Sequence, residues 1–165
     1  SIAAACGGTT TIVDHIAFGP KECNLHHQVN EYYKLSEGKS VIDYSFHGVI
    51  QHVNDSILKE MEELFNDGIT SMKIYMTYDG KLDDSGIYDV LKKAKELGMI
   101  IAVHAENDGV INNLREKYSK EGLLTPEYHG KSRPQECEAE AINRISYIAD
   151  ILEGAPLYIY QVKQD

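Results

Sequence analysis

Short apolar segments alternate with longer segments of helical period along most of the chain. The apolar or β-branched runs cover residues 9–18, 40–50, 70–78, 99–107 and 155–162. Segments with apolar positions three or four residues apart cover residues 25–38, 56–68, 86–98, 109–122 and 136–154. Strands that alternate with helices of this length are typical of βαβ units and a parallel sheet. The pattern therefore predicts an α/β fold with five parallel strands, and it predicts a long loop over residues 122–136, which include two prolines.

Three glycines stand where predicted helices should end. Gly68, Gly98 and Gly154 each follow the last apolar position of a helical segment. A glycine just past a helix commonly adopts the left-handed conformation that closes the helix. We therefore expect a positive φ at all three positions.

Length, charge and cysteine usage narrow the class of protein. The chain has 165 residues, the size of one ordinary domain, and a formal net charge of −10 without a basic cluster, which argues against a nucleic-acid-binding surface. No apolar run approaches the roughly 18 residues of a membrane span, and no secretory signal is recognisable. Cys6, Cys23 and Cys137 show no CxxC spacing, which fits a reducing compartment. These observations predict a cytoplasmic globular protein that binds neither membranes nor nucleic acids.

Polar and ionisable residues follow the ends of the predicted strands. They are Asp14, His15, His47, Tyr78, Asp79, His104, Glu106 and Asn107. In parallel α/β folds the carboxyl ends of the strands meet at one edge, where active sites form. Residues that cap the following helices would produce a similar pattern. The pattern favours a site at this edge over helix capping alone.

Lys73 lies inside a segment that otherwise predicts a buried strand, TSMKIYMTY at residues 70–78. Its stem could pack along the sheet while its amine reaches solvent or an acid. Burial could instead lower the pKa of the amine and leave a neutral nucleophile. A neutral amine that faces a metal could also add carbon dioxide and become a carbamate with two oxygen ligands. The residues alone leave all three explanations open.

Several stretches carry a more specific pattern. Residues 68–78 read GITSMKIYMTY, residues 103–108 read VHAEND, and residues 130–144 read GKSRPQECEAEAINR. In this order and spacing they resemble the lysine strand, the fifth-strand histidine motif and the SRP segment of the dihydropyrimidinase and D-hydantoinase family of cyclic amidohydrolases. GGTTTIVD (7–14) and VIDYSFH (41–47) stand where the second and third strands of that family would fall. The resemblance covers nearly the whole chain.

The resemblance implies a TIM-type (β/α)8 barrel of the amidohydrolase superfamily, of which residues 1–165 would form the central part, strands 2–6. The first strand, with a His-x-His metal pair, and the last two strands, with a strand-end aspartate, would then not be in this chain. The sixth strand should end in a metal-binding histidine, whereas the chain reads Tyr160, Gln161 and Val162 there. Five strands do not close such a barrel, so we expect no ring hydrolysis from this segment alone.

The resemblance also implies an active site with two zinc ions. Lys73, carboxylated by carbon dioxide, would bridge both metals, and His104 would bind one of them. Tyr78 would hydrogen-bond the attacked carbonyl oxygen, and Tyr75 would line the pocket for the ring substituent. The implied reaction opens the ring of a dihydropyrimidine or a 5-substituted hydantoin, a small-molecule cyclic amide, to an N-carbamoyl amino acid. The family further suggests a homotetramer.

Two alternatives remain open. A non-catalytic dihydropyrimidinase-related protein would keep the barrel and lose the metals, but such proteins typically lack the lysine and histidine ligands that are present here as Lys73 and His104. An allantoinase or a dihydroorotase is a second alternative, against which Tyr78 and the SRP sequence argue. The other histidines match no ligand position of the family and are interpreted as surface, capping or packing residues: His15, His26, His27, His47, His52 and His129.

Overall fold

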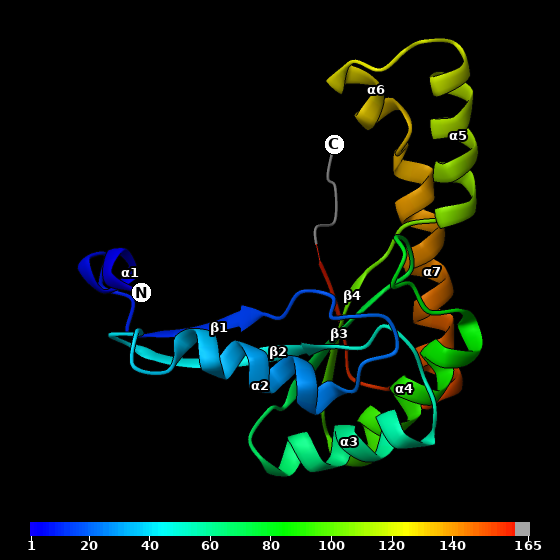
Figure 1. Cartoon of the computed structure of the whole chain (residues 1–165). Coiled ribbons are helices and arrows are strands. Elements are labelled where there is room, and N and C mark those ends of the chain that lie inside the picture. Colours follow the sequence, from blue (N-terminus) through cyan, green and yellow to red (C-terminus); the bar gives the residue numbers. More distant parts are fainter. Residues whose placement is uncertain (161–165) are drawn as a thin grey trace.

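The computed structural model describes residues 1–160, which form one parallel sheet and its connecting helices (Figure 1). The elements are α1 (Ile2–Cys6), β1 (Thr11–His15), α2 (Leu25–Ser36), β2 (Asp43–Val49), α3 (Asp55–Asn66), β3 (Ser71–Tyr75), α4 (Asp84–Leu97), β4 (Ile100–His104), α5 (Asp108–Lys120), α6 (Pro126–Lys131), α7 (Gln135–Ile151) and β5 (Leu157–Ile159). Within this range, no helix has the length and apolar character needed to cross a bilayer.

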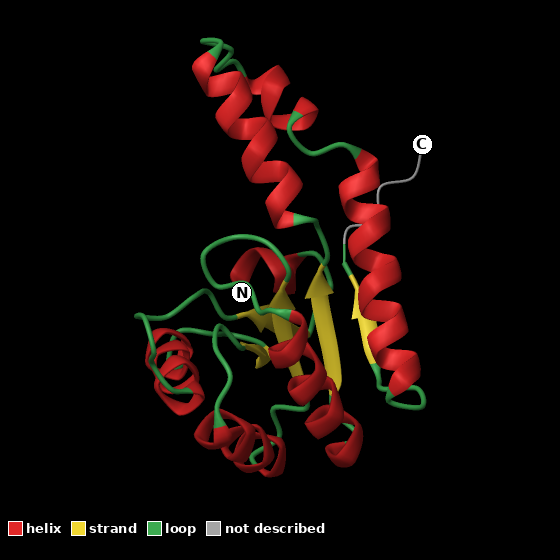
Figure 2. Cartoon of the chain, turned by 90° about the vertical axis from the view of Figure 1, so that its right-hand side faces the viewer, coloured by secondary structure: helices red, strands yellow, loops and turns green. Residues whose placement is uncertain are grey.

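The strands of the described range pair in parallel and in chain order, β1-β2-β3-β4-β5. Right-handed crossovers between neighbouring parallel strands place every connecting helix on the same side of the sheet. Accordingly, α2, α3, α4 and α7 lie along one face, and in the described part of the chain no helix covers the other face (Figures 1 and 2). The predicted five-stranded parallel sheet is confirmed, and we call its uncovered side the open face.

The two faces of β3 differ in burial. Met72 and Ile74 are fully buried toward the helices, whereas Ser71, Lys73 and Tyr75 are only partly buried and point to the open face. This alternation explains how a lysine can interrupt an apolar strand. Lys73 does not enter the hydrophobic core.

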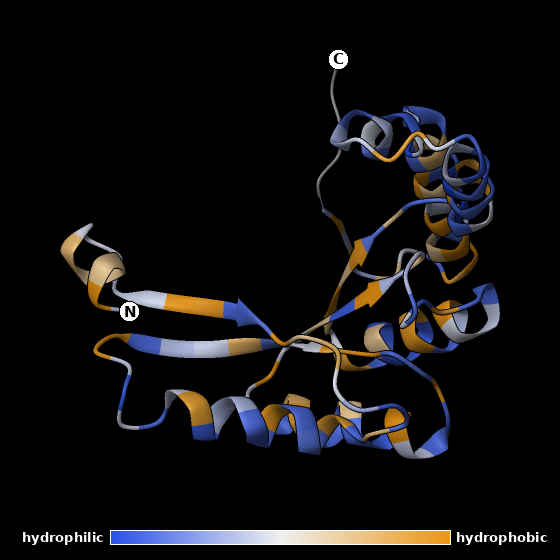
Figure 3. Ribbon diagram, turned by 45° about the horizontal axis from the view of Figure 1, so that its top comes forward, coloured by the Kyte–Doolittle hydropathy of each residue, from blue (hydrophilic) through white to orange (hydrophobic). Residues whose placement is uncertain are grey.

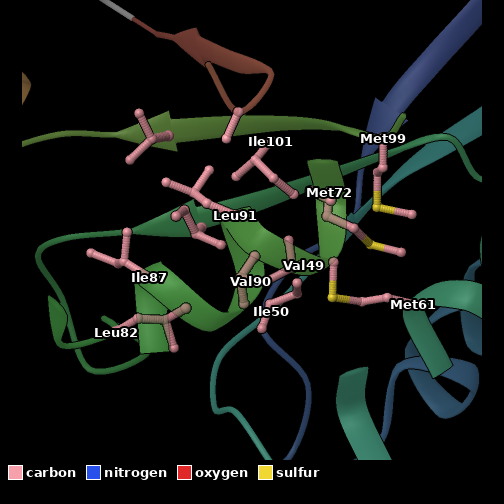
Figure 4. Packing of buried hydrophobic residues seen from close by; sticks show 14 of the residues in the cluster. Val49, Ile50, Met61, Met72, Leu82, Ile87, Val90, Leu91, Met99 and Ile101 are labelled. Atoms are coloured by element: carbon pink, nitrogen blue, oxygen red, sulfur yellow. The ribbon is translucent and has the colours of Figure 1, made fainter. Parts of the chain in front are cut away.

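The hydrophobic core fills the space between the sheet and the helices. Met61 of α3, Met72 of β3, Leu91 of α4 and Ile101 of β4 have no exposed surface and pack together (Figure 4). Burial of one such side chain contributes about 1.5–3 kcal/mol to folding. The core therefore stabilises β3 and β4 on the helix side of the sheet. Their residues on the open face are not needed for core packing and are available for other roles.

The sheet turns sharply between β2 and β3 (Figure 3). These strands pair at only two positions, Gly48 with Met72 and Val49 with Lys73. A Cβ atom at residue 48 would lie 2.2 Å from the Met72 sulfur, so a larger residue there would force the Met72 side chain to move. This close approach brings the end of β2 next to Lys73.

Most of the residues that were predicted to end or cap a helix do so in the structure. Gly68, Gly98 and Gly154 have φ values of 95°, 73° and 87°, which confirms the predicted left-handed positions. Asn107 accepts a hydrogen bond from the backbone N–H of Val110 at 3.1 Å and caps α5, so the capping interpretation is correct for this strand-end residue.

Two helices were not expected. The predicted loop 122–136 contains α6, which begins with Pro126, and α1 precedes the first strand. Proline suits the first helical position because the N–H it lacks would have no partner within the helix. Helices α5 and α6 extend beyond the carboxyl ends of β3 and β4 (Figure 2), and the chain returns from them to the sheet through α7.

Candidate metal centre

Lys73 lies on the open face among aromatic rings. Its amine is 4.9 Å from the ring centroid of Tyr75 and 4.8 Å from that of Tyr160. Burial lowers the pKa of Lys73, and within residues 1–160 no acidic group offsets this effect. An amine in this setting holds its proton less tightly than a free lysine. The explanation in which Lys73 reaches an acid therefore finds no support in the described residues.

Two histidines lie beside this lysine. The rings of His15 and His47 stack with centroids 4.7 Å apart, and His15 also contacts the edge of Tyr160 at 5.1 Å. Burial, followed by the positive charge of Lys73, lowers the pKa of both histidines. The structure thus places His15 and His47 in the candidate site, although the sequence analysis interpreted them as surface, capping or packing residues.

Strand alternation explains which strand-end residues join the site. His15 pairs with His47 in the β1–β2 register, whereas Asp14 pairs with Phe46, which is buried in the core. Adjacent residues of a strand point to opposite faces, so Asp14 lies on the helix side of β1. The predicted cluster at the strand ends therefore includes both histidines and excludes Asp14. A stricter use of the two-residue period would have found this from the sequence.

His104 lies on the same face as Lys73. In the β3–β4 register Lys73 pairs with Ala102 and Tyr75 pairs with His104, so the two predicted ligands stand on neighbouring strands. The Nε2 atom of His104 lies 2.9 Å from Oε2 of Glu106. A carboxylate at one ring nitrogen fixes the tautomer of the imidazole, so a metal at His104 would be bound by Nδ1.

Tyr78 and Tyr75 stand next to His104. The ring of Tyr78 stacks on that of His104 with centroids 5.4 Å apart. The ring centroid of Tyr75 lies 6.0 Å from each of these two centroids. Tyr78 has a φ of 72°, a left-handed conformation that costs a residue with a side chain about 1–3 kcal/mol. Such strain persists where surrounding contacts fix the residue, and it is common at functional sites. The structure thus brings together all four residues that the resemblance selected.

A cavity opens beside these residues. It has a volume of about 370 Å³, within the usual range for small-molecule sites. Its lining includes Tyr78, His104, Glu106, His129, Arg133 and Tyr160. The cavity is large enough for a small cyclic molecule, and both aromatic and ionisable groups face it.

The residues at this edge fit zinc in type and fall short in number. Zinc takes nitrogen, oxygen or sulfur ligands, usually three or four from the protein. Lys73, as a carbamate, and His104 would supply two. Among residues 1–160, no three His, Cys, Asp or Glu side chains come together in a way that could hold a metal ion. Gln161 and Val162, near the expected sixth-strand histidine, lie outside the described residues.

Comparison with known proteins finds a matching family and many similar proteins. Residues 1–145 match the amidohydrolase family. The chain is 50% identical over 157 residues to D-phenylhydantoinase of Escherichia coli O1:K1 / APEC, covering 95% of this chain and 34% of that protein. A solved D-hydantoinase structure matches with a TM-score of 0.90 and 42% identity, covering 96% and 35% of the two chains. Dihydropyrimidinase from Brevibacillus agri NCHU1002 matches with a TM-score of 0.89 and 40% identity, covering 95% and 34%.

The matches agree with the architecture described above. They confirm the predicted fold class, a parallel α/β sheet that forms part of a (β/α)8 barrel. The chain spans about a third of the length of the relatives it matches.

Proposed function

Because the chain belongs to the amidohydrolase family, as its match over residues 1–145 establishes, we propose that it forms the central part of a zinc-dependent hydrolase that opens cyclic amide rings. The proposed substrates are dihydropyrimidines or 5-substituted hydantoins, and the product is an N-carbamoyl amino acid. Similarity to a D-phenylhydantoinase and to D-hydantoinase structures supports this choice. The observation that carries it is Lys73, a partly buried amine of lowered pKa, on the same face as His104.

Lys73 would hold the metals as a carbamate. Carbamate formation joins the neutral amine nitrogen to the carbon of carbon dioxide and releases one proton. The lowered pKa of Lys73 favours this step, since it raises the fraction of neutral amine. Lys73, as a carbamate, and His104 would hold the zinc ions. When bound, such a zinc pair supplies Lewis-acid polarisation of the amide carbonyl and an acidified water.

Tyr78 would assist at the carbonyl group. Its hydroxyl would donate a hydrogen bond to the amide oxygen, and this bond would strengthen as negative charge develops during attack. The ring centroids of Phe18 and Tyr75 lie 4.7 Å apart. We propose that these two rings form one wall of the pocket for an apolar ring substituent. The proposal places the remaining metal ligands on other strands of the barrel, and it includes the expected cytoplasmic location and homotetramer.

The proposal is tested by ring opening in the intact protein that contains this chain. With zinc and bicarbonate present, we expect hydantoin or dihydrouracil to be converted to its N-carbamoyl product. Absence of both zinc binding and turnover of any cyclic amide would favour the non-catalytic relatives. Turnover of allantoin or dihydroorotate in place of these substrates would move the protein to another branch of the family.

Tyr78→Phe keeps the ring that stacks on His104 and removes only the hydroxyl. We expect kcat to fall by about 100-fold while the zinc content stays unchanged, because the lost hydrogen bond acts mainly in the transition state. Steady-state kinetics with metal analysis of the same samples would measure both quantities. A kcat close to that of the unmodified protein would make Tyr78 a packing residue.

A further inference from the structure

A buried ion pair lines the cavity beside the candidate metal centre, and the reaction proposed above does not use it. Glu106 is 7% exposed and Arg133 is 9% exposed, and Nη1 of Arg133 donates to Oε2 of Glu106 at 2.5 Å. Removing two charges from water is costly, and apolar residues of similar volume often serve stability equally well. Fold stability alone therefore gives a weak reason for this pair.

The pair contacts two groups of the site at once. The same carboxylate oxygen of Glu106 that accepts from Arg133 lies 2.9 Å from Nε2 of His104. The guanidinium carbon of Arg133 lies 5.4 Å from the ring centroid of Tyr78. A planar guanidinium can donate to a carboxylate through one N–H while it also lies over an aromatic ring. The pair therefore joins the predicted zinc ligand to the predicted hydrogen-bond donor.

The fold brings these residues together from distant parts of the sequence. Glu106 follows the end of β4 by two residues, whereas Arg133 lies in the turn between α6 and α7. The backbone N–H of Asn107 donates to the carbonyl of Cys137 at 3.0 Å and fastens the first turn of α7 to the end of β4. This connection returns Arg133 from the projecting helices to the site.

We propose that Glu106 and Arg133 are positioning residues for the reaction. Glu106 accepts the N–H of His104 Nε2, which orients the imidazole and presents Nδ1 to the metal. Arg133 compensates the charge of Glu106 and supports the ring of Tyr78 in its left-handed backbone conformation. This inference rests on the proposed function, because the effect on His104 has consequences only if a metal binds there.

Glu106→Gln in the intact, zinc-loaded protein separates positioning from simple support of the fold. The amide has nearly the size of the carboxylate but lacks its charge, so the Nε2 contact weakens. We expect zinc affinity, measured by competition with a chelator, to fall by about 10- to 100-fold. The measurement is made at a temperature where circular dichroism shows the variant to be folded. At saturating zinc, kcat should return to within a few-fold of the unmodified protein.

Arg133 is tested with two substitutions. Arg133→Met should weaken zinc binding as Glu106→Gln does, and it should also lower kcat by about tenfold or more at saturating zinc, because Tyr78 loses its support. Arg133→Lys restores the charge but not the planar face. It should therefore recover much of the zinc affinity and little of the kcat.

Arg144→Met is the matched control. Arg144 also belongs to α7 and forms ion pairs with Asp84 and Glu140 at 2.7 and 2.9 Å, but these pairs are more exposed and lie outside the site. The zinc affinity and the kcat of Arg144→Met should stay unchanged.

If the unmodified protein binds zinc and opens rings while Glu106→Gln keeps full zinc affinity, the positioning role is wrong and the proposed function stands. If the unmodified protein binds no zinc, the proposed function fails and this inference fails with it.

Discussion

Lys73→Ala is expected to abolish zinc binding at the bridged position and ring hydrolysis together. The alanine has no amine to carboxylate, so both oxygen ligands of the proposed bridge disappear. The substitution should leave the fold intact, because Lys73 points to the open face and the core packs behind it through Met72 and Ile74. Metal analysis and a ring-opening assay on the same preparation would measure the two losses.

A lysine on a covering helix provides the control for this substitution. Lys59 lies on α3 and forms an exposed i,i+4 ion pair with Glu63 at 3.2 Å, and such pairs contribute little to stability. Lys59→Ala should keep both the zinc content and the rate of hydrolysis. An active Lys73→Ala variant that still holds two zinc ions would refute the assignment of Lys73.

Removal of the metal is expected to lower the rate of ring hydrolysis as strongly as Lys73→Ala does. Treatment of the intact protein with a chelator should reduce ring opening to the uncatalysed level, and zinc with bicarbonate should restore it. Within residues 1–160, no cluster of three His, Cys, Asp or Glu side chains offers an alternative metal site. The metal-free protein should keep its circular dichroism spectrum, because the hydrophobic core lies on the helix side of the sheet.

The control for metal removal is a direct count of zinc in each sample. Hydrolysis that continues in protein shown to be free of metal would contradict a zinc-dependent mechanism. Restoration by zinc that fails without bicarbonate would add support for a carbamate at Lys73.

Much of the fold could be predicted because local pattern and global architecture agree. The predicted helical segments 56–68 and 86–98 correspond to α3 and α4, whose residues Met61 and Leu91 are fully buried. The segment 70–78 was predicted as a strand, and the structure places Met72 and Ile74 on the face opposite Lys73. The short helix α6 was missed because Pro126, Gly130 and Pro134 lie close together there, and such a composition is typical of loops. Its start at Pro126 depends on the first-turn preference of proline, which was not applied there.

The candidate site was predictable only where a single segment carries the signal. Lys73, Tyr75 and Tyr78 belong to one strand and the turn after it, so a motif could locate them. The proximity of His15 to His47 depends on the register between β1 and β2. Register is a property of paired strands, which one segment read alone does not reveal.

The Glu106–Arg133 pair illustrates the same limit at longer range. Its members are 27 residues apart, and two helices lie between them. Glu106 was recognised as a strand-end residue and Arg133 as part of the SRP sequence. Their contact follows from the return of α7 to the end of β4, which depends on tertiary packing.

The most direct test of the central claim is detection of the carbamate on Lys73. The intact protein would be loaded with zinc in the presence of ¹³C-labelled bicarbonate and studied by ¹³C NMR and by mass spectrometry under native conditions. We expect a carbamate carbon signal and the added mass of one carbon dioxide on the intact protein, both absent from Lys73→Ala. An active, zinc-loaded protein in which Lys73 carries no carbon dioxide would contradict the proposed metal centre.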